Sequence, residues 1–278
     1  MPLRVIESKE RLFEALMNRT VVIKLGGATI ERGRVVEELA GDLRDMPSVF
    51  SIIVHGGGSE IGRYLKILGK KFTFVKGLRV TDEDTVEIVE MVLSGKMNKQ
   101  LVARLQRSGV KALGVSGKDM GLLRAKKYMQ DGEDLGFVGE IAEVDTTLFD
   151  MCAAYGVVPV VSPISFGDSG ETFNVNADHA ALDVARAVAC DDMVFISDVE
   201  GIYRANGEII RRLTPSLADQ LMASGEITGG MIPKVISALD CLEHGVKRAR
   251  IITWKGPGTL QKELAGDESL FGTLVSSE

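Results

Sequence analysis

Apolar runs alternate with amphipathic stretches along the chain, beginning with apolar runs at residues 21–25 and 49–54. Runs of this length that are rich in valine and isoleucine and end in glycines predict buried β-strands. The polar stretch at 34–44 between them predicts a helix. A strand, a helix and a second strand within about 35 residues predict a βαβ unit, and therefore an α/β protein with a mainly parallel sheet.

The same alternation continues through the rest of the chain. It predicts further strands at residues 112–115, 157–162, 193–196, 249–253 and 272–275, and helices at 3–17, 58–68, 82–108, 146–155, 180–189, 217–223, 231–244 and 260–264. Residues 122–144 alternate around 131–136, which predicts a hairpin that covers the functional site. A change in composition near residue 170 indicates two lobes, 1–170 and 171–278, that share one continuous sheet.

The helix predicted at residues 82–108 carries an unusually broad apolar stripe. So broad a surface is either deep core or half of a subunit interface, and we favour an interface that makes the protein a homodimer. The stripe consists of Val86, Val89, Leu93, Met97, Leu101 and Leu105, widened by Ile88, Met91 and Val92.

The composition is that of an ordinary globular protein, with 278 residues of which 45% are hydrophobic and 26% charged. A formal charge of −6 gives no basic field for a nucleic-acid partner. Three cysteines and three histidines, all widely spaced, predict neither disulfides nor a metal cluster. No apolar run approaches the roughly 20 residues of a membrane span, and the N-terminus has no signal-peptide core, so we expect a cytoplasmic protein.

Three glycine-rich turns carry the candidate chemistry. Lys24 comes just before a pair of glycines, the second apolar run ends in the glycines of 55–58, and two glycines at 229–230 precede Lys234. A lysine at the mouth of a buried strand is costly unless an anion lies there, and backbone N–H groups at such turns can bind phosphate. We therefore predict one phosphoryl-transfer site in which Lys24 and Lys234 supply positive charge.

The remaining groups that such a transfer needs are few. Asp178 can hold both lysines in place. A carboxylate acceptor is already ionised near neutral pH, so the reaction needs no general base. Magnesium would be bound mostly through the phosphates of the nucleotide, so we predict no metal ligand from the protein itself.

Polar side chains elsewhere have two interpretations each. Arg79 at a strand end, just before a helix cap at Thr81, suits bidentate capture of a carboxylate, although local sequence alone favours a surface salt bridge. Asn174, Asn176 and Asp178 would share one face of an extended segment and could hold an amide. Plain turn chemistry, with Asp178 as the cap of the following helix, explains the same pattern equally well.

Two glycine patterns suggest nucleotide contacts. Gly56, Gly58 and Gly62 approach a dinucleotide fingerprint, but residues 72–76 lack the acid that would bind a ribose, so simple anion binding is the better interpretation. His55 beside them is expected to be structural. The strand at 193–196 runs into SDVEGIY, which is typical of loops that contact nucleotides beyond the ends of parallel strands.

Several stretches follow one another in the order found in the amino acid kinase superfamily: VVIKLGG, IIVHGGGSEIG, GLRVTDEDTVEIVEMVLSGKMNK, VSGKD, NVNADHAA, ISDVEGIY and ITGGMIPKV. From about residue 20 to 275 the chain resembles in particular the N-acetylglutamate kinases of arginine biosynthesis. The resemblance implies an open αβα sandwich with an N-terminal acceptor lobe and a C-terminal ATP lobe. It also implies N-acetyl-L-glutamate as substrate and ATP with Mg²⁺ as cofactor.

The resemblance implies a role for each matching residue. Lys24 and Lys234 would stabilise the transferring phosphoryl group, and Asp178 would organise them. Arg79 would hold the α-carboxylate of the substrate, and Asn174 with Asn176 its acetamido end. Backbone N–H groups for phosphate and substrate would come from Gly26, Gly27, Gly56 and Gly57. Contacts to ATP would come from Asp198, Val199, Glu200, Gly201, Ile202, Tyr203, Glu226, Ile227 and Thr228.

The ends of the chain differ from those of arginine-inhibited members, which carry a longer N-terminal helix and a histidine with a Gly-x-Gly-Thr pattern near the C-terminus. Here the tail reads GPGTLQKEL and then LFGT, so we predict a dimer without arginine control. Three alternatives stay open. They are a sister kinase acting on a carrier-bound aminoadipate or glutamate, which Asn176 argues against, a nicotinamide-dependent dehydrogenase, and a non-catalytic amino-acid sensor.

Overall fold

The computed structural model describes residues 19–228, 231–266 and 268–277. The helix predicted at 3–17 lies outside these ranges, as do the two glycines at 229–230.

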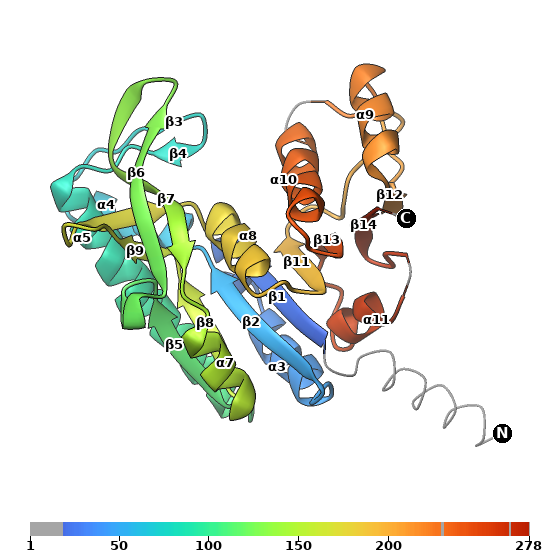
Figure 1. Ribbon diagram of the computed structural model, residues 1–278, viewed down its shortest axis with the longest axis horizontal. Helices are drawn as coiled ribbons and strands as arrows, with labels where there is room; N and C mark the ends of the chain where they lie inside the picture. The colour runs from blue at the N-terminus through green and yellow to red at the C-terminus, as the bar shows by residue number, and fades with distance from the viewer. Residues whose placement is uncertain (1–18, 229–230, 267, 278) are drawn as a thin grey trace.

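An eight-stranded sheet forms the centre of the described structure, in the order β12-β14-β13-β11-β1-β2-β8-β5 (Figure 1). All neighbouring strands run parallel except β13 and β14, which confirms the predicted mainly parallel sheet. The strands of residues 19–162 form one side of the sheet and those of residues 192–276 form the other, and the two sides join where β1 pairs with β11. The strands are β1 (Arg19–Leu25), β2 (Val49–His55), β5 (Ala112–Ser116), β8 (Val158–Ser162), β11 (Asp192–Ser197), β12 (Arg212–Leu213), β13 (Arg248–Thr253) and β14 (Gly272–Ser276).

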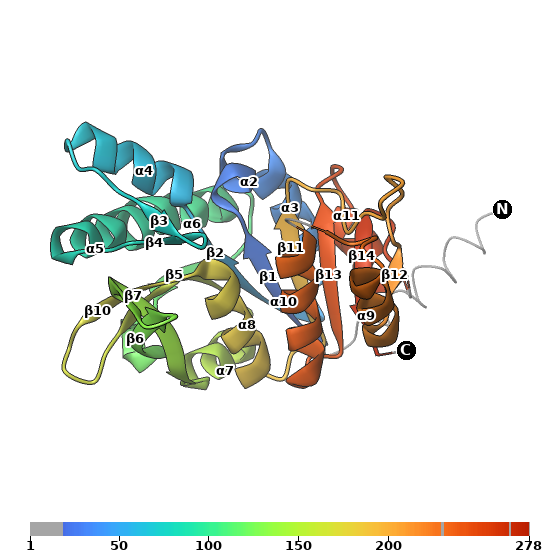
Figure 2. The same ribbon diagram turned by 90° about the horizontal axis from the view of Figure 1, so that it is seen from above.

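Helices cover both faces of the sheet, as the view from above shows (Figure 2). The alternation within β1 accounts for the two layers: Val21 and Ile23 join the core under one set of helices, and Val22 joins the core under the other. One layer contains α2 (Gly27–Glu31), α3 (Val35–Arg44), α4 (Gly58–Ile67), the long helix at 83–107 and α11 (Thr259–Ala265). The other contains α7 (Thr147–Ala154), α8 (Ala177–Ala187), α9 (Pro215–Ala223) and α10 (Met231–Glu243). The predicted αβα sandwich is thus confirmed.

Two smaller β-structures lie beside the main sheet. The predicted hairpin is present as β6 (Leu123–Gln130) and β7 (Glu133–Val144), and it forms a second, four-stranded sheet with β9 (Ile164–Phe166) and β10 (Thr172–Val175). Strands β3 (Phe74–Val75) and β4 (Leu78–Arg79) form a separate two-stranded unit.

The helix predicted at 82–108 is present as α5 (Glu83–Glu90), a π-helical turn (Met91–Met97) and α6 (Asn98–Arg107). Its apolar stripe packs within the chain: Val89, Leu101 and Leu105 are fully buried in a single copy, whereas Met91 is 61% exposed. Packing inside one molecule therefore explains the breadth of the stripe. The homodimer stays a prediction that this stripe no longer supports.

Cys152, Cys190 and Cys241 are buried and free, as expected for small core residues. In the ranges that the structure describes, no helix is long and apolar enough to cross a membrane, and no group of three or more His, Cys, Asp and Glu side chains could hold a metal ion.

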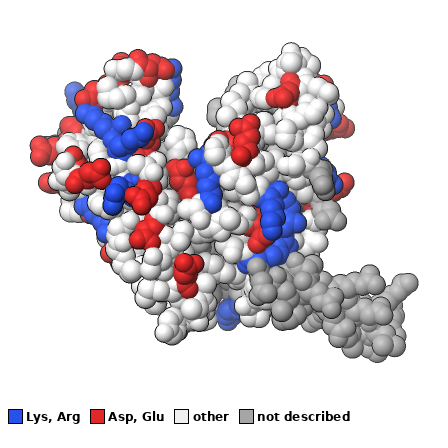
Figure 3. All heavy atoms as spheres, viewed as in Figure 1, with Lys and Arg blue, Asp and Glu red and all other residues white. Residues whose placement is uncertain are grey.

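A deep notch opens between the two halves of the molecule (Figure 3). The β6–β7 hairpin with β3 and β4 stands on one side of it, α9 and α10 stand on the other, and α8 lies near its base (Figure 1). Acidic and basic side chains meet at the base of the notch (Figure 3).

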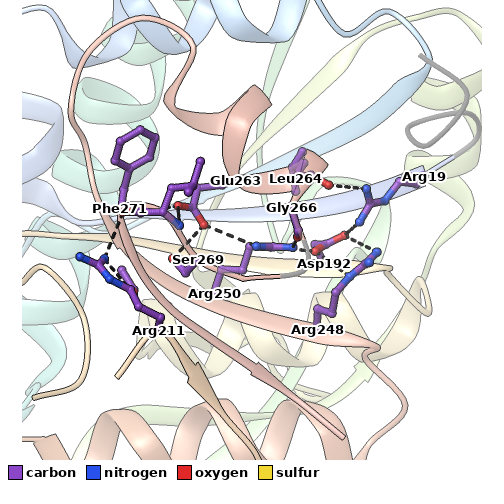
Figure 4. A network of polar contacts seen from close by, with 12 residues as sticks. Arg19, Asp192, Arg211, Arg248, Arg250, Glu263, Leu264, Gly266, Ser269 and Phe271 are labelled. Atoms are coloured by element: carbon purple, nitrogen blue, oxygen red, sulfur yellow. Dashed lines mark hydrogen bonds and ion pairs between the residues drawn. The ribbon is translucent and has the colours of Figure 1, made fainter. Parts of the chain in front are cut away.

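A buried ion network lies at the opposite edge of the sheet, where β1, β11 and β13 begin (Figure 4). Asp192 contacts three guanidinium groups: its carboxylate lies 2.6 Å from Arg19 Nη2, 3.0 Å from Arg248 Nε and 3.1 Å from Arg250 Nε. Arg250 is fully buried and also contacts Glu263, at 3.4 Å. The network ties the first strand of the sheet to its last helix.

Glu263 anchors the segment that leads into β14. Its carboxylate accepts hydrogen bonds from Ser269 Oγ (2.9 Å), Leu270 N (2.8 Å) and Phe271 N (2.6 Å), in addition to its contact with Arg250. A buried carboxylate with several donors is well satisfied, but removing it leaves a buried cation and three donors short of a partner.

We therefore expect Glu263→Ala to lower the free energy of unfolding by about 3–5 kcal/mol, measured by urea denaturation. The matched control is Glu143→Ala, because Glu143 pairs with Arg124 at the surface, where it is 64% exposed. Glu143→Ala should lower the free energy of unfolding by no more than about 1 kcal/mol. If the two variants lost equal free energy of unfolding, the role given to the buried network would be contradicted.

Candidate active site

The turns after β1 and β2 touch each other at the base of the site. A Cβ atom added to Gly27 would lie 3.0 Å from Gly57 Cα, and one added to Gly57 would overlap Met97 and Leu93. A side chain at either position would force its neighbours to shift, so these glycines favour the close contact rather than an unusual backbone angle. Gly56 N donates to Leu25 O (2.9 Å) and holds the two turns in register.

Lys24 and Lys234 face one cavity from different elements, as the sequence predicted. Lys24 Nζ lies 2.8 Å from an Asp178 carboxylate oxygen, and Lys234 Nζ donates to Ser197 Oγ at 3.1 Å. The cavity has a volume of about 270 Å³, and Ser237 of α10 also lines it. Burial lowers the pKa of Lys234, and the nearby ammonium group of Lys24 adds to this effect, while Asp198 and Asp178 oppose it. The site thus concentrates positive charge.

Asn176, and not Asp178, caps helix α8. Helix α8 begins at Ala177, and its N-cap is Asn176, whose Oδ1 accepts from the backbone N–H groups of Asp178 (2.8 Å) and His179 (3.4 Å). The prediction that Asp178 caps this helix was therefore wrong. Its carboxylate is free to pair with Lys24 instead.

A second cavity, of about 190 Å³, adjoins the first, and Asp178 lines both. All the residues expected to contact the acceptor line it: Gly56, Gly57, Arg79, Asn174 and Asn176. The structure thus brings together residues from three separate parts of the sequence next to the two lysines.

Arg79 is a buried cation without a carboxylate partner among the described residues. Its side chain is enclosed by Phe72 and Phe74, whose ring centroids lie 4.4 and 4.6 Å from Cζ. Nη2 donates to Gly58 O (3.1 Å), and Nη1 is buried with no hydrogen-bond partner in the described part of the chain. Burial lowers the pKa of this guanidinium. The surface salt bridge that local sequence favoured is wrong, and the geometry suits a carboxylate ligand.

A neighbouring feature also differs from expectation. The helix after Arg79 is capped by Asp82, which accepts from Thr85 N (2.8 Å), and not by Thr81. A Cβ atom at Gly62, the third glycine of the dinucleotide-like pattern, would lie 3.4 Å from Phe72 Cζ and 3.9 Å from Arg79 Nη2, which is ordinary van der Waals contact.

The two loops expected to contact ATP do not line the cavity around the lysines. Gly201, with a φ angle of +138°, turns the first loop toward β14, where Ile202 N donates to Thr273 Oγ1 (2.8 Å). Ile202 and Ile227 are buried in the core, so only their backbones could meet a nucleotide.

Two charged members of these loops already have partners. Glu200 pairs with Lys255, and Glu226 pairs with Arg204 (2.8 Å). Asp198 is exposed at the end of β11, where its own backbone N–H and Ser197 lower its carboxyl pKa.

The sequence interpretation missed Ser197 and Ser237, which line the lysine cavity. The position of Ser197 at the end of a predicted strand, directly before Asp198, was a usable signal. Ser237 gave no local signal, because its place in the site depends on how α10 packs against β11 and β13.

Comparison with known proteins adds the family. Residues 19–253 match the model of the amino acid kinase family. The chain belongs to this family. It is 44% identical over 265 residues to the acetylglutamate kinase of Caldanaerobacter subterraneus subsp. tengcongensis, covering 94% of this chain and 88% of that one. It is 41% identical over 293 residues to the acetylglutamate kinase of Heliobacterium modesticaldum, covering 98% and 99%.

A solved structure supports the fold of this family member. The N-acetylglutamate synthase of Neisseria gonorrhoeae, complexed with coenzyme A and N-acetyl-glutamate, superposes with a TM-score of 0.86 at 23% identity. The likeness covers all of this chain and 64% of that one. Because the identity is only 23%, it concerns the fold alone.

His55 of this amino acid kinase is structural in its contacts. It is fully buried, Nδ1 lies 3.1 Å from Gly56 O, and Nε2 lies 3.2 Å from Asn98 Nδ2. A neutral ring with its proton on Nδ1 satisfies both contacts. Burial lowers the pKa of His55 to about 4.

Below pH 6.5 the unfolded chain takes up a proton on His55 that the folded protein does not, so stability should fall as the pH decreases. We expect the stability difference between the wild type and His55→Gln to shrink by about 3 kcal/mol between pH 7 and pH 4. Urea denaturation at both pH values measures it. A difference that does not change with pH would show that His55 is not held neutral.

Proposed function

We propose that this amino acid kinase transfers the γ-phosphoryl group of ATP to the side-chain carboxylate of N-acetyl-L-glutamate, a step of arginine biosynthesis. The products would be N-acetyl-L-glutamyl 5-phosphate and ADP. Acetylglutamate kinases that are 41–44% identical over nearly the whole chain support this assignment. The structural observation that carries it is the junction of two cavities at Asp178, one lined by two lysines and one lined by a buried arginine that has no carboxylate partner among the described residues.

The acceptor cavity matches the chemistry of N-acetyl-L-glutamate. The Arg79 guanidinium would bind the α-carboxylate through Nη1, which would gain a partner and offset the cost of burying the charge. Asn174 and Asn176 would face the acetamido group. Because Asn176 Oδ1 is already used as the helix cap, this residue can offer only its N–H groups.

The lysine cavity matches phosphoryl transfer. A nucleotide and a dicarboxylic acid repel each other, so the protein must supply positive charge where their oxygen atoms gather. Lys24 and Lys234 do so from strand and helix, and the glycine N–H groups of 26–27 and 56–57 would add dipoles. No general base is required, because the attacking carboxylate is already ionised.

ATP with Mg²⁺ would occupy the half of the molecule that contains α9 and α10, and residues 198–203 and 226–228 would contact the nucleotide. The donor set favours a metal held mainly by phosphate oxygens, since the lysine cavity contains two ammonium groups and one carboxylate that is already paired. We also expect a cytoplasmic homodimer with an acceptor lobe at 1–170 and an ATP lobe at 171–278.

An acceptor panel tests the reaction, with Mg-ATP present and hydroxylamine added to trap an acyl phosphate. We expect a hydroxamate with N-acetyl-L-glutamate and none with L-glutamate, L-aspartate, N-acetyl-aminoadipate or carbamate. A signal with a different acid would overturn the acceptor but keep the lysine roles. Binding of N-acetyl-L-glutamate without turnover would instead indicate a sensor.

Replacing Lys234 with Met should lower kcat at least about 100-fold, because a preorganised charge at the transferring phosphoryl group is lost. The thermal unfolding midpoint should change little, since Lys234 makes one hydrogen bond to Ser197 in a solvent-accessible cavity. Lys66→Met is the matched control, because Lys66 is exposed on α4. Normal turnover by a folded Lys234→Met protein would refute this mechanism.

A further inference from the structure

Thr81 lies between two residues that face the acceptor cavity, and its hydroxyl group contacts both. Oγ1 donates to Arg79 O at 2.7 Å and accepts from Asn174 Nδ2 at 3.3 Å. Thr81 itself is fully buried and does not line the cavity. Its hydroxyl is therefore placed to act on a ligand only through its neighbours.

The backbone of Thr81 fixes a third element, the β6–β7 hairpin. Thr81 N donates to Leu135 O (2.9 Å), and Thr81 O accepts from Phe137 N (2.7 Å). Gly136 between them has a φ angle of +77°, and a Cβ atom there would overlap Thr81 O. The next residue of β7, Val138, lines the acceptor cavity and pairs with Asn174 in the neighbouring strand. Strands β4, β7 and β10 thus meet at Thr81.

The hydroxyl group determines which way the Asn174 amide is turned. A threonine hydroxyl has one proton to donate, and here it is committed to Arg79 O. Oγ1 can then only accept from Asn174, so the amide must present Nδ2 to Thr81. The carbonyl oxygen Oδ1 is left as the group that Asn174 can offer to the donor N–H of a ligand.

We propose that Thr81 is a positioning residue that selects acceptors carrying an N-acyl group, an inference that rests on the proposed function. By holding Arg79 and Asn174 through one hydroxyl, it fixes the spacing between the carboxylate site and the amide site. It also fixes Asn174 Oδ1, an acceptor, as the group that faces the acetamido N–H of the substrate. If the Asn174 amide were flipped, its NH₂ group would face that N–H, and two donors would oppose each other.

The test compares wild type, Thr81→Val and Thr81→Ser. Valine keeps the shape and the backbone bonds but removes the hydroxyl, and serine keeps the hydroxyl. We expect Thr81→Val to raise the KM for N-acetyl-L-glutamate about 10-fold and the KM for ATP less than about 2-fold, with kcat reduced less than the acceptor affinity. Thr81→Ser should stay within about 3-fold of wild type. Circular dichroism shows whether each variant is folded.

Asn174→Ala supplies a double-mutant cycle. If Thr81 acts through Asn174, the effect of Thr81→Val on the acceptor KM should fall to about 2-fold in the Asn174→Ala background. A full effect there, an equal rise in both KM values, or no rescue by serine would indicate a merely structural role and overturn the inference. If Thr81→Val fails to fold, Thr81→Ser is compared with Asn174→Ala. The inference then requires that Thr81→Ser keeps the wild-type KM for the acceptor and that Asn174→Ala raises it.

Direct calorimetric titration with N-acetyl-L-glutamate separates this inference from the function. A wild type that binds the acid but transfers no phosphate overturns the proposed function alone, and the binding constants of the variants then judge Thr81. An active wild type with an unchanged KM in Thr81→Val overturns the inference about Thr81 alone. A wild type that neither binds nor phosphorylates the acid overturns both.

Discussion

The ammonium group of Lys24 lies at the end of the central strand β1, 2.8 Å from Asp178, where strands β1 and β2 meet in touching glycine turns. Everything else at the site is arranged around this charge. The Gly27–Gly57 contact brings the acceptor cavity against the lysine cavity, and α10 adds a second ammonium group. Partly buried positive charge is unfavourable in the free protein, and a bound anion would offset that cost.

The charged side chains at the two edges of the sheet differ in the partners that they have. At the edge where strands begin, each of the three arginines contacts the Asp192 carboxylate, and Arg250 also contacts Glu263. At the edge where strands end, Arg79 has no carboxylate partner among the described residues, and Lys234 has a hydroxyl partner. Ligands bind at the carboxyl ends of parallel strands, and that is the edge where these two cations lack a carboxylate.

The sequence predicted the main sheet and most helices because alternation and glycine turns are local signals. The helix predicted at 217–223, for example, is present as α9, which begins at Pro215 after the N-cap Thr214. The sequence was less successful where several residues compete for one role. Asn176 and Asp178 are both suitable caps for α8, and Thr81 and Asp82 are both suitable caps for α5. In each case the residue that contacts a distant partner is not the cap. Asp178 pairs with Lys24, and the Thr81 hydroxyl contacts Arg79 and Asn174.

Burial was the other source of error. The enclosure of Arg79 by Phe72 and Phe74 is a local contact, since Phe74 pairs with Arg79 across β3 and β4, but it depends on a strand pairing that the sequence interpretation did not assign. An apolar stripe does not reveal whether it faces its own sheet or another subunit, because that depends on contacts between elements far apart in the sequence. The π-helical turn Met91–Met97 was not predicted either, and its residues Leu93 and Met97 pack closely against Gly57.

The exposure of the Lys24–Asp178 pair fits its position between the two cavities. The Asp178 side chain is 45% exposed, and ion pairs that are open to solvent contribute only about 0–1 kcal/mol. In the proposed reaction, Lys24 would exchange its carboxylate partner for a phosphate oxygen at little cost. A pair buried like Arg250 and Asp192, both fully inaccessible, would hold its cation too tightly for such an exchange. The protein thus has its fully buried ion pairs at the edge where the strands begin and a partly exposed pair between the two cavities.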